Sequence, residues 1–436
     1  MKKNHAPEDR VKKNPSPIIG LVQTIVIVSD SYAHRRNAQR TLFAGPNSHF
    51  LRNLRCAVFF VTRPSMSKRY QLKDLDLTNT LFLTLTPIGA LLLGGLWIYT
   101  EGFDLRQVYG MLFFYFLAGL SITAGYHRLF SHRAYEASAP VRLFFLLFGA
   151  SAFQNSVLKW GADHRVHHNK VDTDEDPYNI NEGFFFAHMG WVMLKQNARC
   201  HEKYVRDLQK DPLVMWQHKY YVYIAVAVGM LLPTLVGGLF FGSYLGGFAL
   251  GGLAKIVLIH HCTFFINSLC HCVGTTPYTK SNSAKDSWYM ALLTFGEGYH
   301  NFHHYFQTDY RNGVRWYQFD PTKWLIKSLE QVGLARKLRV TPLEKILSAR
   351  LQMKIESLKS RKVRADYLGE IEALKARIIS SLERFQKMKH ELAERRGQLT
   401  REMRDDLRLK MELARLEFEH AWKTLHLQLS LAPVGV

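Results

Sequence analysis

The stretch VYGMLFFYFLAGLSITAGYHRLFSH, residues 108–132, runs without a break from a long apolar segment into a pair of histidines. Residues 108–126 are long and apolar enough to cross a bilayer, which takes roughly 20 residues at the helical rise. His127 and His132 follow at once. The stretch therefore predicts a membrane-spanning helix that leads directly into a histidine site at the membrane boundary.

Three more segments have the length and composition of membrane spans, at residues 80–99, 220–241 and 245–266. The connectors TEGFDLRQ (100–107) and GSYLGG (242–247) are short, so the four spans are expected to form two helical hairpins. The run VRLFFLLFGASAF, residues 141–153, is too short to span and predicts an interfacial or re-entrant helix. The predicted fold is an all-α integral membrane protein with four transmembrane helices.

The charges between the spans predict the orientation. Lys and Arg are dense before the first span, between the second and third, and after the fourth, whereas the two short connectors carry only Arg106. Because basic loops stay on the cytosolic side, both termini and every histidine motif are expected to be cytosolic.

The overall composition agrees with a membrane domain that carries basic cytosolic parts. Apolar residues make up 47% of the 436 residues and the formal net charge is +21, yet the mean hydropathy is slightly negative. The basic residues flank apolar spans and no zinc-finger or similar signature occurs, which argues against nucleic acid binding. The five cysteines form no CxxC pair and fit a reducing compartment, with packing as their expected role.

Three regions are expected along the chain: a basic cytosolic segment at 1–76, a membrane domain at 77–330 and a helical extension at 341–429. The apolar run at 18–28 predicts a packed strand or helix, and Met66 resembles a second start, so residues 1–65 could be an extension. In the last region apolar residues recur every three or four positions, which predicts amphipathic helices broken near Gly369 and Gly397. We expect a helical hairpin or coiled coil that packs on itself or on a second copy; docking of a specific partner is the alternative.

The histidines carry the strongest chemical signal. They occur as HRLFSH (127–132), HRVHH (164–168) and HNFHH (300–304), and His271 follows the fourth span. Helical positions i, i+3 and i+4 share a face, so each HxxHH run is expected to present its rings together. The five-residue spacing of the first motif does not share a face as well and predicts that the helix ends or loosens there.

Converging neutral imidazoles are metal ligands, and six to nine of them are too many for a single ion. Two metal ions are the economical interpretation. Histidine ligands alone do not distinguish iron from zinc. An apolar site at a membrane boundary is poorly suited to hydrolysis by zinc, whereas a pair of irons can activate dioxygen toward an unactivated C–H bond.

Five strings together resemble the stearoyl-CoA or acyl-CoA desaturase family: GYHRLFSH (125–132), WGADHRVHHNKVDTDEDPYN (160–179), GFFFAHMGW (183–191), INSLCH (266–271) and GEGYHNFHH (296–304). The resemblance covers roughly residues 75–320. It implies a di-iron centre held by nine histidines, namely His127, His132, His164, His167, His168, His271, His300, His303 and His304, with Asn267 contacting one iron through water. It also implies an O2-dependent conversion of a saturated acyl chain to a cis alkene, near carbon nine.

Departures from the family pattern leave the acyl carrier open. An Arg-Asp pair that helps to hold CoA in the animal enzymes is matched by Ala162 and Asp163, and a basic pair is matched by Lys195 and Gln196. The substrate could therefore be an acyl-CoA, an acyl carrier protein or a lipid. Lys195 is a candidate for binding the head group, and Phe264 matches a tryptophan of the family's substrate tunnel.

Several carboxylates near the motifs are expected to support the histidines by hydrogen bonds rather than to ligate metal. Asp163 and Glu297 are the chosen candidates for this role; the others are Asp172, Asp174, Glu175, Asp176 and Glu182. The chain has no GxGxxG fingerprint and no ferredoxin-type cysteine spacing. The electrons must then come from a separate ferredoxin, rubredoxin or b-type cytochrome with its reductase, attracted by the basic cytosolic face.

Three alternatives compete with a desaturase. A related di-iron membrane hydroxylase or ketolase would use the same ligands. A haem or metal transporter would distribute its histidines through the depth of the bilayer, whereas these cluster beyond the span ends. A coiled-coil membrane scaffold with a degenerate metal site would keep its function after loss of His303.

Overall fold

The computed structural model describes residues 70–195, 202–360, 364–395 and 398–431. The predicted segment at 18–28, the proposed extension at 1–65, and the residues Cys56, Cys200 and Gln196 lie outside these ranges. The described chain divides into a larger unit that ends at Gly369 and a smaller unit that begins at Glu370.

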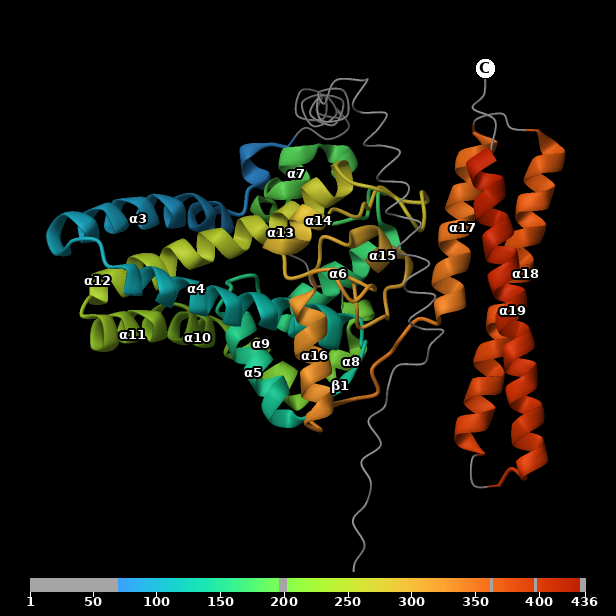
Figure 1. Ribbon diagram of the computed structural model, residues 1–436. Coiled ribbons are helices and arrows are strands. Elements are labelled where there is room, and N and C mark those ends of the chain that lie inside the picture. The colour runs from blue at the N-terminus through green and yellow to red at the C-terminus, as the bar shows by residue number, and fades with distance from the viewer. Residues whose placement is uncertain (1–69, 196–201, 361–363, 396–397, 432–436) are drawn as a thin grey trace, which may run out of the picture. The chain divides into compact units, whose positions relative to one another are not determined.

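Four helical segments of the larger unit are long and apolar enough to cross a membrane. They are α3 (Leu77–Glu101); α4 (Leu105–Leu120) continued by the π-helix η2 (Ser121–Ser131); α10 (Tyr221–Val226), η7 (Ala227–Leu231) and α11 (Leu232–Phe241); and α12 (Tyr244–Gly246), η8 (Gly247–Ala254) and α13 (Lys255–Cys272). These segments confirm the four predicted spans; three have slightly wider bounds, and the third begins one residue later than predicted. Figure 1 shows them running side by side away from the shorter helices.

The fourth span is packed against the other three, through contacts of η8 with α3, α4 and α11. Small residues make this packing close, as they do between helices in membranes. A Cβ atom on Gly237 of α11 would lie 2.4 Å from the Cα atom of Gly247 in η8. Gly242 turns the chain between these two spans at a φ of +79°, a left-handed conformation that glycine adopts without strain.

Shorter elements form a cap at one end of the spans. The helical ones are η1 (Leu72–Asp74), α5 (Ala139–Ala150), α6 (Val157–Lys170), η3 (Ile180–Glu182), α7 (Phe184–His188), η4 (Gly190–Met193), η6 (Glu202–Tyr204), α8 (Arg206–Gln209), α9 (Pro212–Lys219), α14 (Trp288–Leu293), α15 (His300–Tyr305), α16 (Pro321–Gln331) and α17 (Leu343–Lys359). A two-residue antiparallel pair, β1 (Glu136–Ala137) with β2 (Ala335–Arg336), joins the start of α5 to the end of α16. At 12 residues, α5 is the predicted apolar helix that is too short to span.

The smaller unit contains a helical hairpin of α18 (Ala365–Glu394), from Glu370 onward, and α19 (Arg401–Leu431). The two helices are antiparallel, because Arg384 pairs with Glu417 while Gln428 donates to Glu370 over 3.2 Å. The predicted helix break at Gly369 is wrong, because this glycine lies inside α18. A single glycine lowers the stability of a helix without necessarily ending it. Gly397 lies outside the described residues.

Candidate metal centre

The first histidine motif lies on a loosened helix, as predicted. The second span changes from α-helix to π-helix at Ser121, and the backbone N–H of His132 donates to the carbonyl of His127 over 3.0 Å. This is a hydrogen bond across five residues, the pattern of a π-helix. The wider turn brings residues five apart nearly into line, so the rings of His127 and His132 lie 4.8 Å apart between centroids.

The nine predicted histidines converge in two groups. The five-ring group contains His127, His132, His164, His168 and His303, and the four-ring group contains His167, His271, His300 and His304. Within each group the possible ligand atoms all lie within 4.8 Å of one another. The structure thus brings together every histidine that the sequence singled out.

Each HxxHH run divides its rings between the two groups. On α6, His164 and His168 enter the five-ring group while His167 enters the other. On α15 the division is reversed: His300 and His304 enter the four-ring group and His303 enters the five-ring group. The helical turn accounts for this, because residue i+4 lies about 40° to one side of residue i and residue i+3 lies about 60° to the other.

The donor atoms fit metal ions. Facing Nε2 atoms are separated by 3.0 Å in the pairs His127–His303 and His271–His300, and by 3.2 Å in His167–His304. A neutral imidazole whose Nδ1 carries the proton offers only a lone pair at Nε2, so two such atoms repel unless a cation lies between them. Nitrogens that bind one metal ion at about 2.1 Å lie roughly 3.0 to 3.4 Å apart, so these spacings suit pairs of nitrogens on a single ion.

Buried acceptors lie beside Nδ1 of three rings and favour a proton at that atom. Nδ1 of His127 lies 2.9 Å from Oε2 of Glu297, and Nδ1 of His167 lies 2.9 Å from Oδ1 of Asp176. Nδ1 of His271 lies 2.6 Å from Oγ of Ser283. A proton held at Nδ1 leaves the Nε2 lone pair for a metal, which is the usual arrangement around metal-bound histidine.

Glu297, predicted as a supporting carboxylate, is part of a larger buried network. Its Oε1 accepts hydrogen bonds from Nε and Nη2 of Arg128, the residue next to His127. Arg128 also forms an ion pair with Asp320 at 3.0 Å, and Asn312 donates to Glu297 over 2.6 Å. Burial opposes the charge of Glu297, but attraction to Arg128 and His127 and their hydrogen bonds together outweigh it and lower the pKa of this carboxyl.

Asp176 and Ser283 are supports that the sequence did not single out. The sequence indicated Asp172 and Asp176 only as two of several carboxylates in the acidic loop, and the structure joins the two by a hydrogen bond. Asp176 accepts from the backbone N–H of Asp172 over 3.1 Å, and Asp172 accepts from both the backbone and the hydroxyl of Ser283. Nothing in the spacing of a loop indicates which carboxylate turns inward.

Of the remaining candidates, three line a neighbouring cavity and one is on the surface. Asp163 lines a neighbouring cavity, where burial raises its pKa to about 8, and no hydrogen bond joins it to a histidine within the described residues. Lys195 is exposed and donates to the carbonyl of Lys73 over 2.8 Å, away from that cavity. Phe264 is buried and lines the cavity, as does Asn267.

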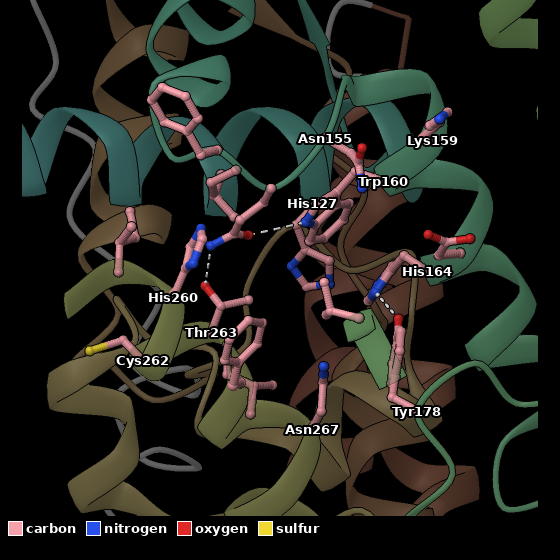
Figure 2. Close-up of a pocket in the computed structure, with 18 of the residues that line it drawn as sticks. His127, Asn155, Lys159, Trp160, His164, Tyr178, His260, Cys262, Thr263 and Asn267 are labelled. Carbon is pink, nitrogen blue, oxygen red and sulfur yellow. Dashed lines mark hydrogen bonds between the residues drawn. The ribbon is translucent and has the colours of Figure 1, made fainter. Parts of the chain in front are cut away.

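The cavity adjoins both histidine groups. Its volume is about 590 Å³, and its lining includes His127 and His164 of the five-ring group and His167 and His300 of the four-ring group. Figure 2 shows His127, His164 and Asn267 around the same open space. Apolar side chains such as Phe82, Ile122, Phe153, Ile259 and Phe295 form much of the wall, which also includes polar ones, among them Asp76, Asn79, Asn155 and Lys159.

The surroundings keep six of the nine histidine rings neutral. Burial, followed by the positive potential of neighbouring rings, moves the pKa of six cap histidines well below the ordinary value: His132, His164, His168, His300, His303 and His304. Neutral rings are the form that binds metal. The residues present therefore suit two metal ions, one in each group.

Loss of the Asp176 carboxylate is expected to weaken metal binding. Asp176→Ala removes the acceptor at Nδ1 of His167 and the loop contacts to the backbone N–H groups of Asp172 and Tyr178. Metal affinity is expected to fall roughly 10- to 100-fold, measured by competition with a chelator. Asp174→Ala, in the same loop but exposed, is the matched control, and equal affinities for the two variants would contradict the assignment.

The fold and the site define a class: helical proteins with four apolar spans and a cap in which histidines surround two metal positions beside a buried cavity. The model of the fatty acid desaturase family matches residues 106–336, and the chain belongs to that family.

Named relatives agree with the family. A Schizosaccharomyces pombe protein named probable acyl-CoA desaturase is 43% identical over 258 residues, which are 59% of this chain and 54% of that protein. Acyl-CoA desaturase 1 of Saccharomyces cerevisiae is 41% identical over 257 residues, 59% of this chain and 50% of that protein. The match thus spans about half the length of these two relatives. The sn-1 stearoyl-lipid 9-desaturase of Anabaena variabilis is 33% identical over 272 residues, 61% of this chain and 95% of that protein.

Proposed function

We propose that this protein is an acyl-CoA desaturase that uses O2 to convert a saturated fatty-acyl chain to a cis-monounsaturated chain, at carbon nine. The observation that carries the proposal is the contact between the two histidine groups and a largely apolar cavity. The desaturase domain corresponds to residues 77–330, and residues 341–429 form a helical extension. A related di-iron hydroxylase acting on a fatty-acyl chain or lipid is the second candidate, because the same ligands would serve it.

The nine histidines would hold two irons, with Asn267 in reach of one of them through water. The iron pair would supply activation of dioxygen toward a C–H bond that no side chain can attack. The protein's own part is positional. Phe264, Ile122 and Phe295 hold a methylene segment of the acyl chain beside the rings and exclude water from it.

The polar side chains of the cavity wall suit the head of the acyl substrate. Lys159 and Asn155 lie in the lining, and Lys159 offers a cation to a thioester carrier or a phosphate-bearing head group. CoA is the proposed carrier, since the yeast relatives are named acyl-CoA desaturases. A lipid carrier is the alternative, since the Anabaena relative is named a stearoyl-lipid desaturase. Turnover of purified protein with an acyl-CoA or an acyl lipid as sole substrate separates the two.

Lipid profiling tests the reaction itself. Cells that express the wild type are expected to gain a monounsaturated acyl species two mass units below its precursor, and cells that express His167→Ala are not. His390→Ala, which replaces an exposed histidine of α18, is expected to behave as the wild type. A product sixteen mass units heavier than the precursor would favour the hydroxylase, and the same lipids in all strains would refute both functions.

The electron donor is proposed to be an external ferredoxin, rubredoxin or b-type cytochrome with its reductase, docked on the basic cytosolic face. The net charge of +21 supports this, because an acidic carrier is attracted over a Debye length of about 30 Å at 0.01 M salt but only about 3 Å at 1 M. The rate with the protein donor is therefore expected to fall steeply across that range, while the rate with a small uncharged reductant stays constant. Equal salt dependence with both donors would contradict electrostatic docking.

A further inference from the structure

Helix α19 is apolar on two faces. One face packs in the hairpin and buries Ala414, Phe418, Ala421, Trp422 and Leu425. A second face carries Leu409, Leu413 and Leu416, with exposed fractions of 61%, 58% and 53%, and Leu427 at 60%. Spacings of four and three place these side chains in one row along the helix. We call Leu409, Leu413, Leu416 and Leu427 the leucine stripe.

The row continues beyond the leucines with charged residues. In steps of four and three it runs through Glu402, Asp406, Leu409, Leu413, Leu416, His420, Lys423 and Leu427. Its beginning is acidic and its later part is basic. A row that keeps alternating steps of four and three over 26 residues has the repeat of a helix that packs lengthwise against another helix.

The charge of α19 favours a protein partner over a membrane surface. The helix has six basic and six acidic side chains, although the chain as a whole carries +21. Acidic residues flank the leucine stripe at Glu402, Asp405, Asp406, Glu412 and Glu419. A helix that lies on anionic lipid has Lys and Arg on its polar face instead.

We propose that the leucine stripe binds the same stripe of a second copy of this chain, with the two α19 helices antiparallel. About a midpoint between Leu413 and Leu416, each Leu413 then faces Leu416 of the second copy, and each Asp406 faces Lys423. At the outer positions Leu409 faces His420 and Leu427 faces Glu402. The contact is isologous, so every favourable pair forms twice. A parallel arrangement would instead place Asp406 against Asp406 and Lys423 against Lys423, which like charges disfavour.

The mass of the full chain in detergent, measured by native mass spectrometry over a range of protein concentrations, tests the proposal. The wild type is expected to be a dimer, and Leu413→Asp is expected to raise the dissociation constant at least tenfold, because each dimer then buries two carboxylates. Ala376→Asp adds a carboxylate to an exposed position of α18 and is expected to leave the dimer intact. A wild type that stays monomeric, or a Leu413→Asp variant that stays dimeric, would overturn the proposal.

Exchanging the charges of Asp406 and Lys423 tests the antiparallel direction. The double variant also shows whether a single variant fails to dimerise only because it misfolds. Asp406→Lys and Lys423→Asp are each expected to raise the dissociation constant, roughly three- to tenfold for exposed pairs that occur twice. The double variant restores the opposite charges and is expected to dimerise as the wild type does. A double variant that dimerises as weakly as the single variants would refute self-association through α19. So would a full chain that binds anionic vesicles through the leucine stripe but has the mass of a monomer at every concentration.

Discussion

Replacing either His164 or His167 by alanine is expected to lower the rate of desaturation by more than about 100-fold, beyond the usual cost of losing a supporting contact. The two rings are three residues apart on α6 but belong to different histidine groups. If both groups are needed for one reaction, either loss disables the whole centre. The double variant is then expected to be no less active than the single variants, because residues that act as a unit are not additive.

The single variants also separate the two groups by metal content. His164→Ala leaves the four-ring group complete, and His167→Ala leaves the five-ring group complete. Each purified variant is expected to retain more metal than the double variant, while His390→Ala retains the full amount. Losses of rate that multiply in the double variant would mean that the two groups act independently, against the proposed mechanism.

Replacing Arg128 by methionine is expected to lower the free energy of unfolding by about 3–5 kcal/mol, the usual cost of removing one partner from a buried ion pair. The guanidinium of Arg128 lies between the carboxylates of Glu297 and Asp320, and all three side chains are buried. Without it, two carboxylates face each other away from water. Denaturant unfolding in detergent, followed by circular dichroism, measures the loss.

A second variant separates lost charge from lost packing. Arg128→Met combined with Glu297→Gln and Asp320→Asn removes the uncompensated charges and is expected to recover part of the stability. Arg336→Met breaks an exposed pair with Glu136 and is expected to change stability little. An Arg128→Met variant as stable as Arg336→Met would contradict the role assigned to the buried network.

The spans and the loosened first motif could be predicted from the sequence because both depend on local rules. An uninterrupted apolar run needs only its length, and a five-residue spacing does not fit the α-helical repeat. The division of each HxxHH run was missed, because the three rings were assigned to one face without regard to their angular offsets. The offsets of His164, His167 and His168 were available from the helical turn alone.

The supporting residues could be predicted only in part. Glu297 lies three residues before His300, and the structure brings it to His127, a contact between segments far apart in the sequence. The contacts of Asp176 and Ser283 with the histidines depend on how two loops meet in the folded chain. No periodicity in the sequence predicts that arrangement. The helix through Gly369 was missed for a different reason: one glycine costs about 1 kcal/mol in a helix, and the packing of α18 outweighs it.

The metal content of the purified full chain tests the central claim most directly. Elemental analysis after expression in iron-replete medium is expected to find two irons per chain, and fewer in His164→Ala and His167→Ala. Stoichiometric zinc, or no metal together with no uptake of iron under reducing conditions, would contradict a di-iron centre built by these nine histidines.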